Sequence, residues 1–187
     1  SRMPHGRLLA IICILWVASE LAVMVLKHAR GNASRRDRGS LRVLWAGISV
    51  ATVAGSMVSG YRPTAIGYDT FWIGLGLIIL GIIIRAIAIA TLWRYFTVDV
   101  SIREGHELVD RGIYGVIRHP AYTGSLLSFL GLGFAFGNWL SVGIIAIATI
   151  IGFSYRITVE EGALIEHFGD RYRDYMRRSK RLIPGIY

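Results

Sequence analysis

A short polar cluster interrupts a chain that is otherwise largely hydrophobic. Within RGIYGVIRHPAYTG, residues 111–124, a proline separates Arg118 and His119 from Tyr122. Proline has no backbone donor, disfavours helical geometry in the residue before it, and suits the first turn of a helix. Arg118 and His119 are therefore predicted just outside a helix start, where free N–H groups and the helix dipole favour an anion. The alternatives are a histidine that caps the helix or contacts lipid, and an interfacial aromatic belt of Tyr114 and Tyr122.

Four further ionisable residues lie in or next to apolar stretches. Arg156 and Glu160 are four residues apart and share a helix face, so they form either an ordinary intrahelical salt bridge or part of a site. Glu20 and Arg85 interrupt apolar segments, where a charge is costly unless it is paired or faces water. Both are predicted roughly 9 to 12 Å from the same membrane face, close enough in depth to pair. Alternatively, Arg85 snorkels to the headgroups, or lines a lipid-substrate entrance and binds an anionic headgroup.

The elements that position these residues are predicted to be membrane helices. The chain has 187 residues, of which 53% are hydrophobic and 18% charged, with a mean hydropathy of +0.50, which is too apolar for one water-soluble core of this size. Helices of about 20 residues cross a hydrocarbon core and satisfy their own backbone hydrogen bonds. Four apolar stretches are long enough and a fifth is short: residues 8–26, 43–59, 71–93 and 139–155, and residues 123–136.

We therefore expect an all-α integral membrane protein with five transmembrane helices. Gly137-Asn138 predicts a tight turn that joins the last two helices in a hairpin. After the last span, apolar residues at helical spacing predict an amphipathic cytoplasmic tail helix, with Gly169 as the point where it bends or breaks. Residues 1–93 would supply three N-terminal helices, and residues 94–187 would form the catalytic part of a single membrane domain.

The formal net charge of +9 is distributed among the loops as membrane topology requires. The first and third polar loops and the C-terminal tail are rich in basic residues, whereas the second loop has only Arg62. The positive-inside rule then places the N-terminus outside and the C-terminus in the cytoplasm. We expect these basic residues to contact anionic membrane lipids, and no nucleic acid. Cys13 is the only cysteine, so no disulfide and no cysteine metal site can form within one chain, and no metal is expected.

The order of motifs in the C-terminal half resembles one enzyme family. GHELV is followed by GIYGVIRHPAY, a helical hairpin, RITVEEGALIEHFGDRYRDY and RLIPGIY. This order is similar to the isoprenylcysteine carboxyl methyltransferases and their relatives among the phospholipid methyltransferases. RHPxY alone recurs in several membrane enzyme families, but its combination with the upstream and downstream motifs is much more specific.

The resemblance implies S-adenosylmethionine as methyl donor, bound at the cytoplasmic face between the polar segment, the hairpin and the tail. Arg156 would take the family's substrate-side arginine position, and we expect Arg156 and His119 to be the catalytic residues and Arg85 a further substrate-binding residue. Asp99 stands where the eukaryotic enzymes have a glutamine, so that contact is not carried over. By motif position, the donor-binding residues would be His106, Glu107, Leu108, Val109, Tyr114, His119, Pro120, Ala121, Tyr122 and Glu160.

The expected partner is a lipophilic small molecule or lipid, but the sequence leaves the acceptor and the oligomeric state open. An isoprenylcysteine-like carboxylate is ionised at pH 7 and needs no base, whereas a phospholipid amine must lose a proton, for which His119 or Glu161 is a conceivable base. Two other hypotheses are an NADPH-dependent membrane reductase, since sterol-reductase-like proteins resemble the same region, and a non-enzymatic scaffold or transporter component.

Overall fold

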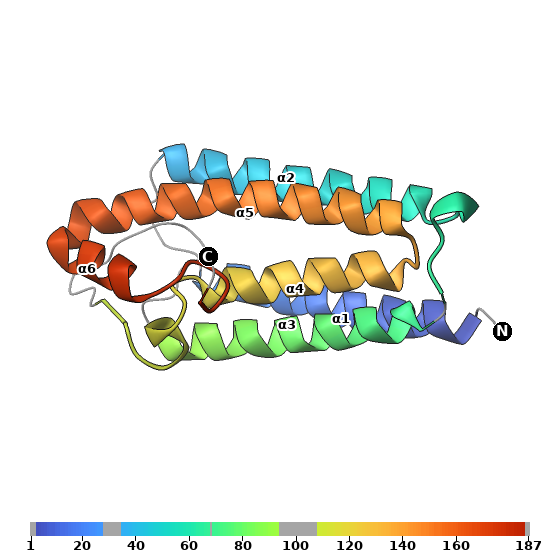
Figure 1. Cartoon of the computed structure of the whole chain (residues 1–187), viewed down its shortest axis with the longest axis horizontal. Helices are drawn as coiled ribbons and strands as arrows, with labels where there is room; N and C mark the ends of the chain where they lie inside the picture. The colour runs from blue at the N-terminus through green and yellow to red at the C-terminus, as the bar shows by residue number, and fades with distance from the viewer. Residues whose placement is uncertain (1–2, 28–34, 68, 94–107, 186–187) are drawn as a thin grey trace.

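The computed structural model describes residues 3–27, 35–67, 69–93 and 108–185. Within these residues every regular element is a helix, and the only extended pairings are two isolated β-bridges, Ala65–Asn138 and Ile117–Lys180. The predicted all-α class is therefore confirmed. In chain order the elements are α1 (Met3–Lys27), α2 (Arg35–Val58), η1 (Arg62–Thr64), α3 (Thr70–Leu92), η3 (Gly112–Gly115), α4 (Pro120–Ala135), α5 (Trp139–Phe168) and α6 (Asp170–Arg178), where η marks a short 3-10 helix (Figure 1).

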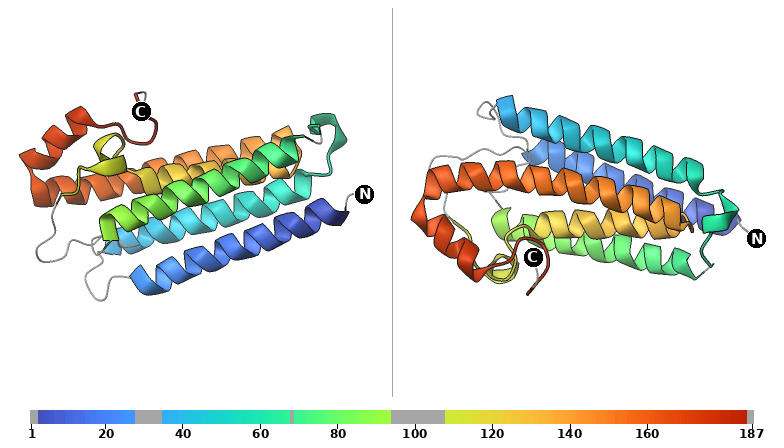
Figure 2. Two further views of the ribbon diagram at one scale, coloured as in Figure 1. Left: turned by 90° about the horizontal axis from the view of Figure 1, so that it is seen from below. Right: turned by 45° about the horizontal axis from the view of Figure 1, so that its top comes forward.

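The five long helices run along a common direction, and four of them form two layers (Figure 1). Figure 1 shows α2 beside α5 in one layer and α3 beside α4 in the other. The α3–α4 contact is the most extensive, followed by α2–α5 and α4–α5, whereas α1 touches α3 only sparsely. The left view of Figure 2 places α1 at the outer edge of the bundle. The start of α4 is therefore held in place mainly by the packing of α4 against α3 and α5.

Glycines set the close approach of α3 and α4. Gly74 of α3 faces Gly131 of α4, and Gly81 of α3 faces Gly124 of α4. The two glycines of each helix are seven residues apart. A Cβ atom added to Gly74 or Gly131 would lie 2.5 Å from the carbonyl oxygen of the other residue. Small residues let membrane helices pack backbone against backbone, where apolar burial gives little driving force. This contact fixes α4, and with it the RHPAY segment, against α3.

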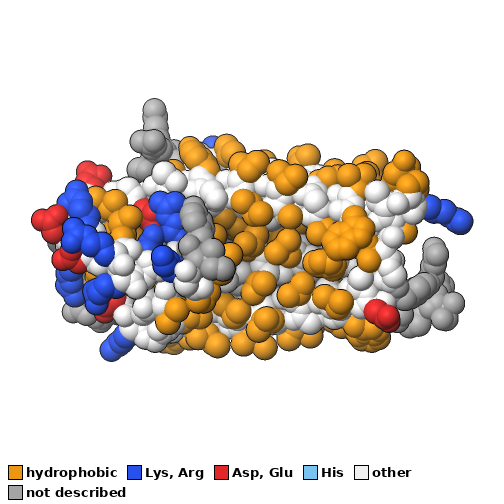
Figure 3. All heavy atoms as spheres, in the orientation of Figure 1, with side chains coloured by type: hydrophobic (Ala, Val, Ile, Leu, Met, Phe, Trp, Pro, Cys, Tyr) orange, Lys and Arg blue, Asp and Glu red, His pale blue; other side chains and the backbone are white. Residues whose placement is uncertain are grey.

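The outer surface of the bundle is apolar. Among the described residues, α1, α2, α3 and α5 are long and apolar enough to cross a membrane. Large side chains such as Ile14, Val53, Ile83 and Ile151 are more than 45% exposed. Figure 3 shows apolar side chains along most of the bundle and charged side chains gathered at the end that holds α6. The chain is therefore a multi-pass membrane protein.

The short hairpin arm is α4. Its 16 residues extend about 24 Å, less than the hydrocarbon thickness of about 30 Å, so the fifth complete span stays a prediction. The tight turn after α4 is confirmed, with Gly137 at φ +66°. Asn138 begins α5 by accepting hydrogen bonds from the amides of Leu140 and Ser141, and its Nδ2 donates to Tyr61 at 2.9 Å.

The last long helix continues further than the sequence predicts. The apolar stretch ends near residue 155, but α5 runs to Phe168 without interruption. The change from apolar to charged residues alters the surroundings of a helix and not its backbone, so it does not end the helix. The chain breaks at Gly169, as predicted, where φ is +57°, a conformation that suits glycine. Arg156 and Glu160 therefore belong to the same continuous helix as the apolar stretch.

Candidate active site

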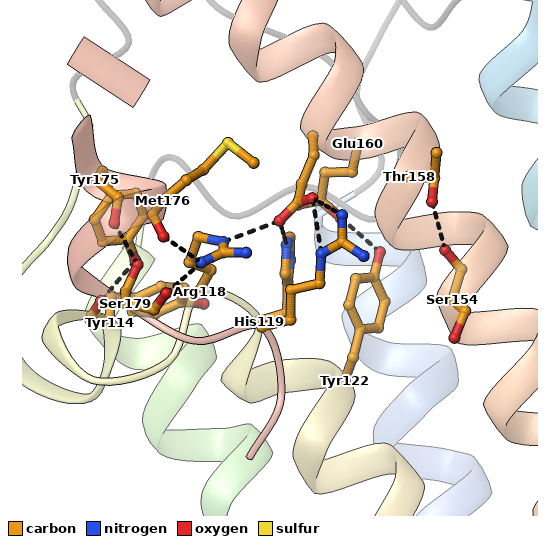
Figure 4. Close-up of polar contacts among 12 residues, drawn as sticks. Tyr114, Arg118, His119, Tyr122, Ser154, Thr158, Glu160, Tyr175, Met176 and Ser179 are labelled. Carbon is orange, nitrogen blue, oxygen red and sulfur yellow. Dashed lines mark hydrogen bonds and ion pairs between the residues drawn. The ribbon is translucent and has the colours of Figure 1, made fainter. Parts of the chain in front are cut away.

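The RHPAY segment lies where α4 begins, beside α6 and α5 (Figure 4). His119 precedes the helix with φ −125° and ψ 56°, and Pro120 is the first helical residue, so the predicted helix start is confirmed. The His119 side chain makes no capping hydrogen bond and is only 4% exposed, so the capping and lipid-contact alternatives are wrong. Instead, its Nε2 lies 3.3 Å from Oε1 of Glu161.

Glu161 of α5 is the centre of an ion-pair cluster. Its Oε1 accepts a hydrogen bond from Nε of Arg118 at 2.9 Å, and its Oε2 accepts from Nε of Arg181 at 3.0 Å. Arg118 also donates through Nη1 to the carbonyl oxygens of Met176 and Ser179. Glu161 is only 3% exposed, and a buried carboxylate is stable only with such partners. The cluster joins the start of α4, the far end of α5 and the segment after α6.

The neighbouring carboxylate points elsewhere. Glu160 accepts a hydrogen bond from the Tyr122 hydroxyl at 2.8 Å through Oε2, as Figure 4 shows. The Tyr122 ring lies between His119 and Phe153, with ring centroids 5.7 and 5.4 Å away. The structure therefore brings three predicted site residues, His119, Tyr122 and Glu160, into one group.

Arg156 lies one helical turn before Glu160, on the side of α5 that packs against α2. Its side chain is 1% exposed, and Nη1 donates to Oγ of Ser40 at 2.6 Å. The guanidinium also interacts electrostatically with the Tyr122 phenol. A buried arginine beside a tyrosine carries a planar set of N–H donors, a geometry that suits a carboxylate ligand.

Tyr114 lies in the interior and not in an interfacial belt. It is 6% exposed, in η3, and packs with Ala88 and Ala121. Its carbonyl oxygen accepts a hydrogen bond from the Tyr175 hydroxyl at 2.6 Å. Burial raises the pKa of Tyr175 to about 12, so this phenol keeps its proton and ties α6 to η3. Of the upstream motif, Leu108 and Val109 are half-buried, whereas His106 and Glu107 lie outside the described residues.

Arg85 and Glu20 form the ion pair that their depths suggested. Nε of Arg85 lies 2.5 Å from Oε1 of Glu20, and Nη2 donates to Oε2 at 2.7 Å. Nη1 of Arg85 also donates to the carbonyl oxygen of Ala121 at 3.2 Å, within the RHPAY segment. The pair therefore links α1 to α3 and to the start of α4. A substrate-binding role for Arg85 stays a prediction.

The assembled group suits an organic ligand that carries a cationic centre. Tyr122 offers an aromatic face, and the Glu160 carboxylate can pair with an ammonium or hydroxyl group. Among the described residues, no cluster of three or more histidine, cysteine or acidic side chains could hold a metal. Sequence reasoning missed Arg181. The available signal was the doubled carboxylate Glu160-Glu161, because two adjacent acids at the end of a membrane helix require cations nearby.

Comparisons with known proteins point to one group of enzymes. A family model described as phospholipid methyltransferase matches residues 70–171, more than half of the chain. Protein-S-isoprenylcysteine O-methyltransferase B of Arabidopsis thaliana is 39% identical over 121 residues, which cover 62% of this chain and 61% of that protein. The protein-S-isoprenylcysteine O-methyltransferase of Dictyostelium discoideum is 34% identical over 129 residues, which cover 68% and 54%.

A solved structure agrees with these sequence relatives. The eukaryotic intramembrane Ras methyltransferase, an isoprenylcysteine carboxyl methyltransferase, superposes with a TM-score of 0.62 at 28% identity, covering 76% of this chain and 52% of that chain. The chain thus spans little more than half the length of the proteins it matches. The matched segment includes α3, η3, α4 and α5, the elements that carry the site described above.

Proposed function

Since the chain belongs to the phospholipid methyltransferase family, with isoprenylcysteine carboxyl methyltransferases among its relatives, we propose that it is a membrane methyltransferase. It would use S-adenosylmethionine to methylate the carboxyl group of an isoprenylcysteine-like acceptor. The observation that carries this proposal is the Tyr122–Glu160 hydrogen bond at the junction of α4 and α5, with Arg156 buried one turn away. These groups match the two ligands that the reaction requires, a cationic donor and an anionic acceptor.

The donor would lie against the start of α4. S-adenosylmethionine supplies, when bound, a sulfonium methyl that is already electrophilic. The protein therefore needs mainly to position the reactants and exclude water. Tyr122 and Tyr114 would offer aromatic surfaces, and Glu160 would pair with an amino or hydroxyl group of the donor.

The acceptor would approach from the membrane side of the same junction. A carboxylate is ionised at neutral pH, so no proton has to be removed before it attacks. Arg156 can hold it through two parallel N–H···O bonds and aim one oxygen at the methyl group. The exposed apolar surface of the bundle suits an acceptor that carries a prenyl or similar lipid tail.

A phospholipid amine is the second candidate acceptor, favoured by the description of the matching family and by the His119–Glu161 contact. An ammonium group must lose a proton before it can attack. A histidine oriented by a carboxylate is a common general base, and this pair lies beside Tyr122. The two acceptors give different products, since a methyl ester is base-labile and a methylated amine is not.

The charged end of the bundle would face the cytoplasm. The described part of this end carries the exposed residues Arg171, Arg173, Arg177 and Arg178, and arginine-rich ends of membrane helices remain on the cytoplasmic side. The N-terminus, at the opposite end in Figure 1, would then lie outside. This orientation gives the site access to a soluble donor from the cytoplasm and to lipids from the inner leaflet.

The test is methyl transfer by the purified full chain from labelled S-adenosylmethionine into a prenylcysteine analogue and a total lipid extract. Base-labile label in the analogue is expected. Base-stable label in phospholipid would replace the carboxyl acceptor with an amine. If no label were transferred and titration gave no S-adenosylmethionine binding, the proposal would be wrong, and NADPH in a thermal-shift series would test the reductase alternative.

A further inference from the structure

A short segment after α6 crosses the start of α4. Residues 179–182, here named the C-terminal strap, run parallel to the RHPAY segment through the Ile117–Lys180 bridge. The strap holds the backbone on both sides of His119. Its hydrogen bonds run from Lys180 N to Val116 O (3.1 Å), from Arg118 N to Lys180 O (2.7 Å), from His119 N to Arg181 O (3.0 Å), and from Thr123 Oγ1 to Leu182 O (2.8 Å).

The strap also reaches the ion-pair cluster through one side chain. Nε and Nη2 of Arg181 lie 3.0 and 2.8 Å from Oε2 of Glu161. The other oxygen, Oε1, is shared by Nε of Arg118 at 2.9 Å and Nε2 of His119 at 3.3 Å. Arg181 thus acts on His119 in two ways. Its carbonyl oxygen accepts the hydrogen bond from the His119 amide, and its guanidinium holds Glu161, which contacts the His119 ring.

We propose that Arg181 is a positioning residue of the methyl-donor site, which fixes the His119 ring beside Tyr122 by holding Glu161 and the backbone of His119. The inference rests on the proposed function, because the site that Arg181 acts on is the proposed donor site. Arg181 acts indirectly, since its described contacts are with Glu161 and with the His119 amide.

The charge of Arg181 has a consequence that a packing role lacks. If glutamine replaces Arg181, the Glu161 carboxylate loses the cation on Oε2 and keeps Arg118 and His119 on Oε1. A charge-assisted hydrogen bond is stronger than a neutral one, so Glu161 is then held less firmly. The His119 ring that Glu161 orients is then less firmly placed beside Tyr122, and donor binding weakens. The charged or titratable side chains around this cluster are Arg118, Tyr122, Glu160, Glu161, Tyr172 and Arg181.

The experiment measures kcat and the KM for S-adenosylmethionine of the full chain. Arg181→Gln is expected to raise KM about tenfold, as the loss of one hydrogen bond to a charged group would, and to lower kcat less. Arg181→Lys keeps the charge, so its KM should stay near that of the wild type. The matched control is Arg177→Gln, which removes an exposed cation of α6.

An Arg181→Gln protein with the same KM as the Arg177→Gln protein would overturn the inference. If Arg181→Gln does not fold, Thr123→Val takes its place, because it frees the Leu182 carbonyl and keeps every charge of the cluster. It should raise KM about threefold, and an unchanged KM would equally overturn the inference. A wild-type chain that neither binds the donor nor transfers methyl would instead refute the proposed function, so the two failures are distinguishable.

Discussion

The Tyr122 hydroxyl links the start of α4 to the Glu160 carboxylate on α5, and Tyr122→Phe removes that link together with the interaction between the phenol and Arg156. The O–H donates to Oε2 of Glu160 at 2.8 Å, while the ring packs between His119 and Phe153. Phenylalanine keeps both ring contacts and the aromatic face that a cationic donor would meet. The variant therefore separates the polar contacts of the hydroxyl, of which the bond to Glu160 is the shortest described, from the packing of the site.

A hydrogen bond to a charged group contributes about 1.5–3 kcal/mol. If the hydroxyl holds Glu160 toward the donor, its loss should weaken S-adenosylmethionine binding by about ten- to a hundredfold, since about 1.4 kcal/mol corresponds to a factor of ten. The fold should survive, because Glu160 is only half-buried and water can replace the lost donor.

The assay is titration calorimetry of S-adenosylmethionine with the purified protein. The matched control is Tyr155→Phe, which removes a hydroxyl from a residue of α5 that is 47% exposed and should leave the affinity unchanged. A Tyr122→Phe protein that bound the donor within about threefold of the wild type would refute the reasoning, because the expected loss is at least about tenfold.

Three further predictions concern stability, each checked by thermal unfolding in detergent. Gly131→Ala should lower the free energy of unfolding by about 1–3 kcal/mol, because its Cβ would meet α3 backbone at 2.5 Å, whereas Gly143→Ala, with open space, should not; equal melting temperatures would contradict this. Glu20→Gln should lower the melting temperature by leaving a mostly buried Arg85 without its carboxylate, and Arg85→Gln added to it should recover part of the loss; no recovery would argue against the pair. Tyr172→Phe should leave the melting temperature unchanged or raise it, since that buried hydroxyl has no hydrogen-bond partner among the described residues, and a clear fall would refute this.

Features that depend on local chemistry could be predicted from the sequence. The proline at position 120 decides where α4 begins, and Gly137-Asn138 decides where the hairpin turns, because backbone geometry at these residues depends on their own side chains. The Glu20–Arg85 pair was also predictable, since the cost of a lone charge in lipid leaves few other solutions.

The parts that escaped prediction depend on contacts between distant segments. Arg181 lies twenty residues after Glu161 and sixty-two after His119, and no periodicity relates these positions. Its role arises only when the chain reverses at Gly169 and the strap returns across α4. The continuity of α5 past Tyr155 escaped prediction for a different reason, since the polar residues after Tyr155 do not change the backbone preference, and a helix can leave the membrane without ending.

The two adjacent carboxylates of α5 illustrate how one helix can serve structure and chemistry at once. Successive residues of a helix point about 100° apart, so Glu160 and Glu161 face different neighbours. Glu161 is surrounded by Arg118, His119 and Arg181, which satisfy its charge and hold three segments together. Glu160 accepts from the neutral Tyr122, so its negative charge is not cancelled by that partner and remains available to a cation. The contacts that hold Glu161 therefore also hold Glu160, the carboxylate proposed to bind the donor, because both residues belong to one helical turn.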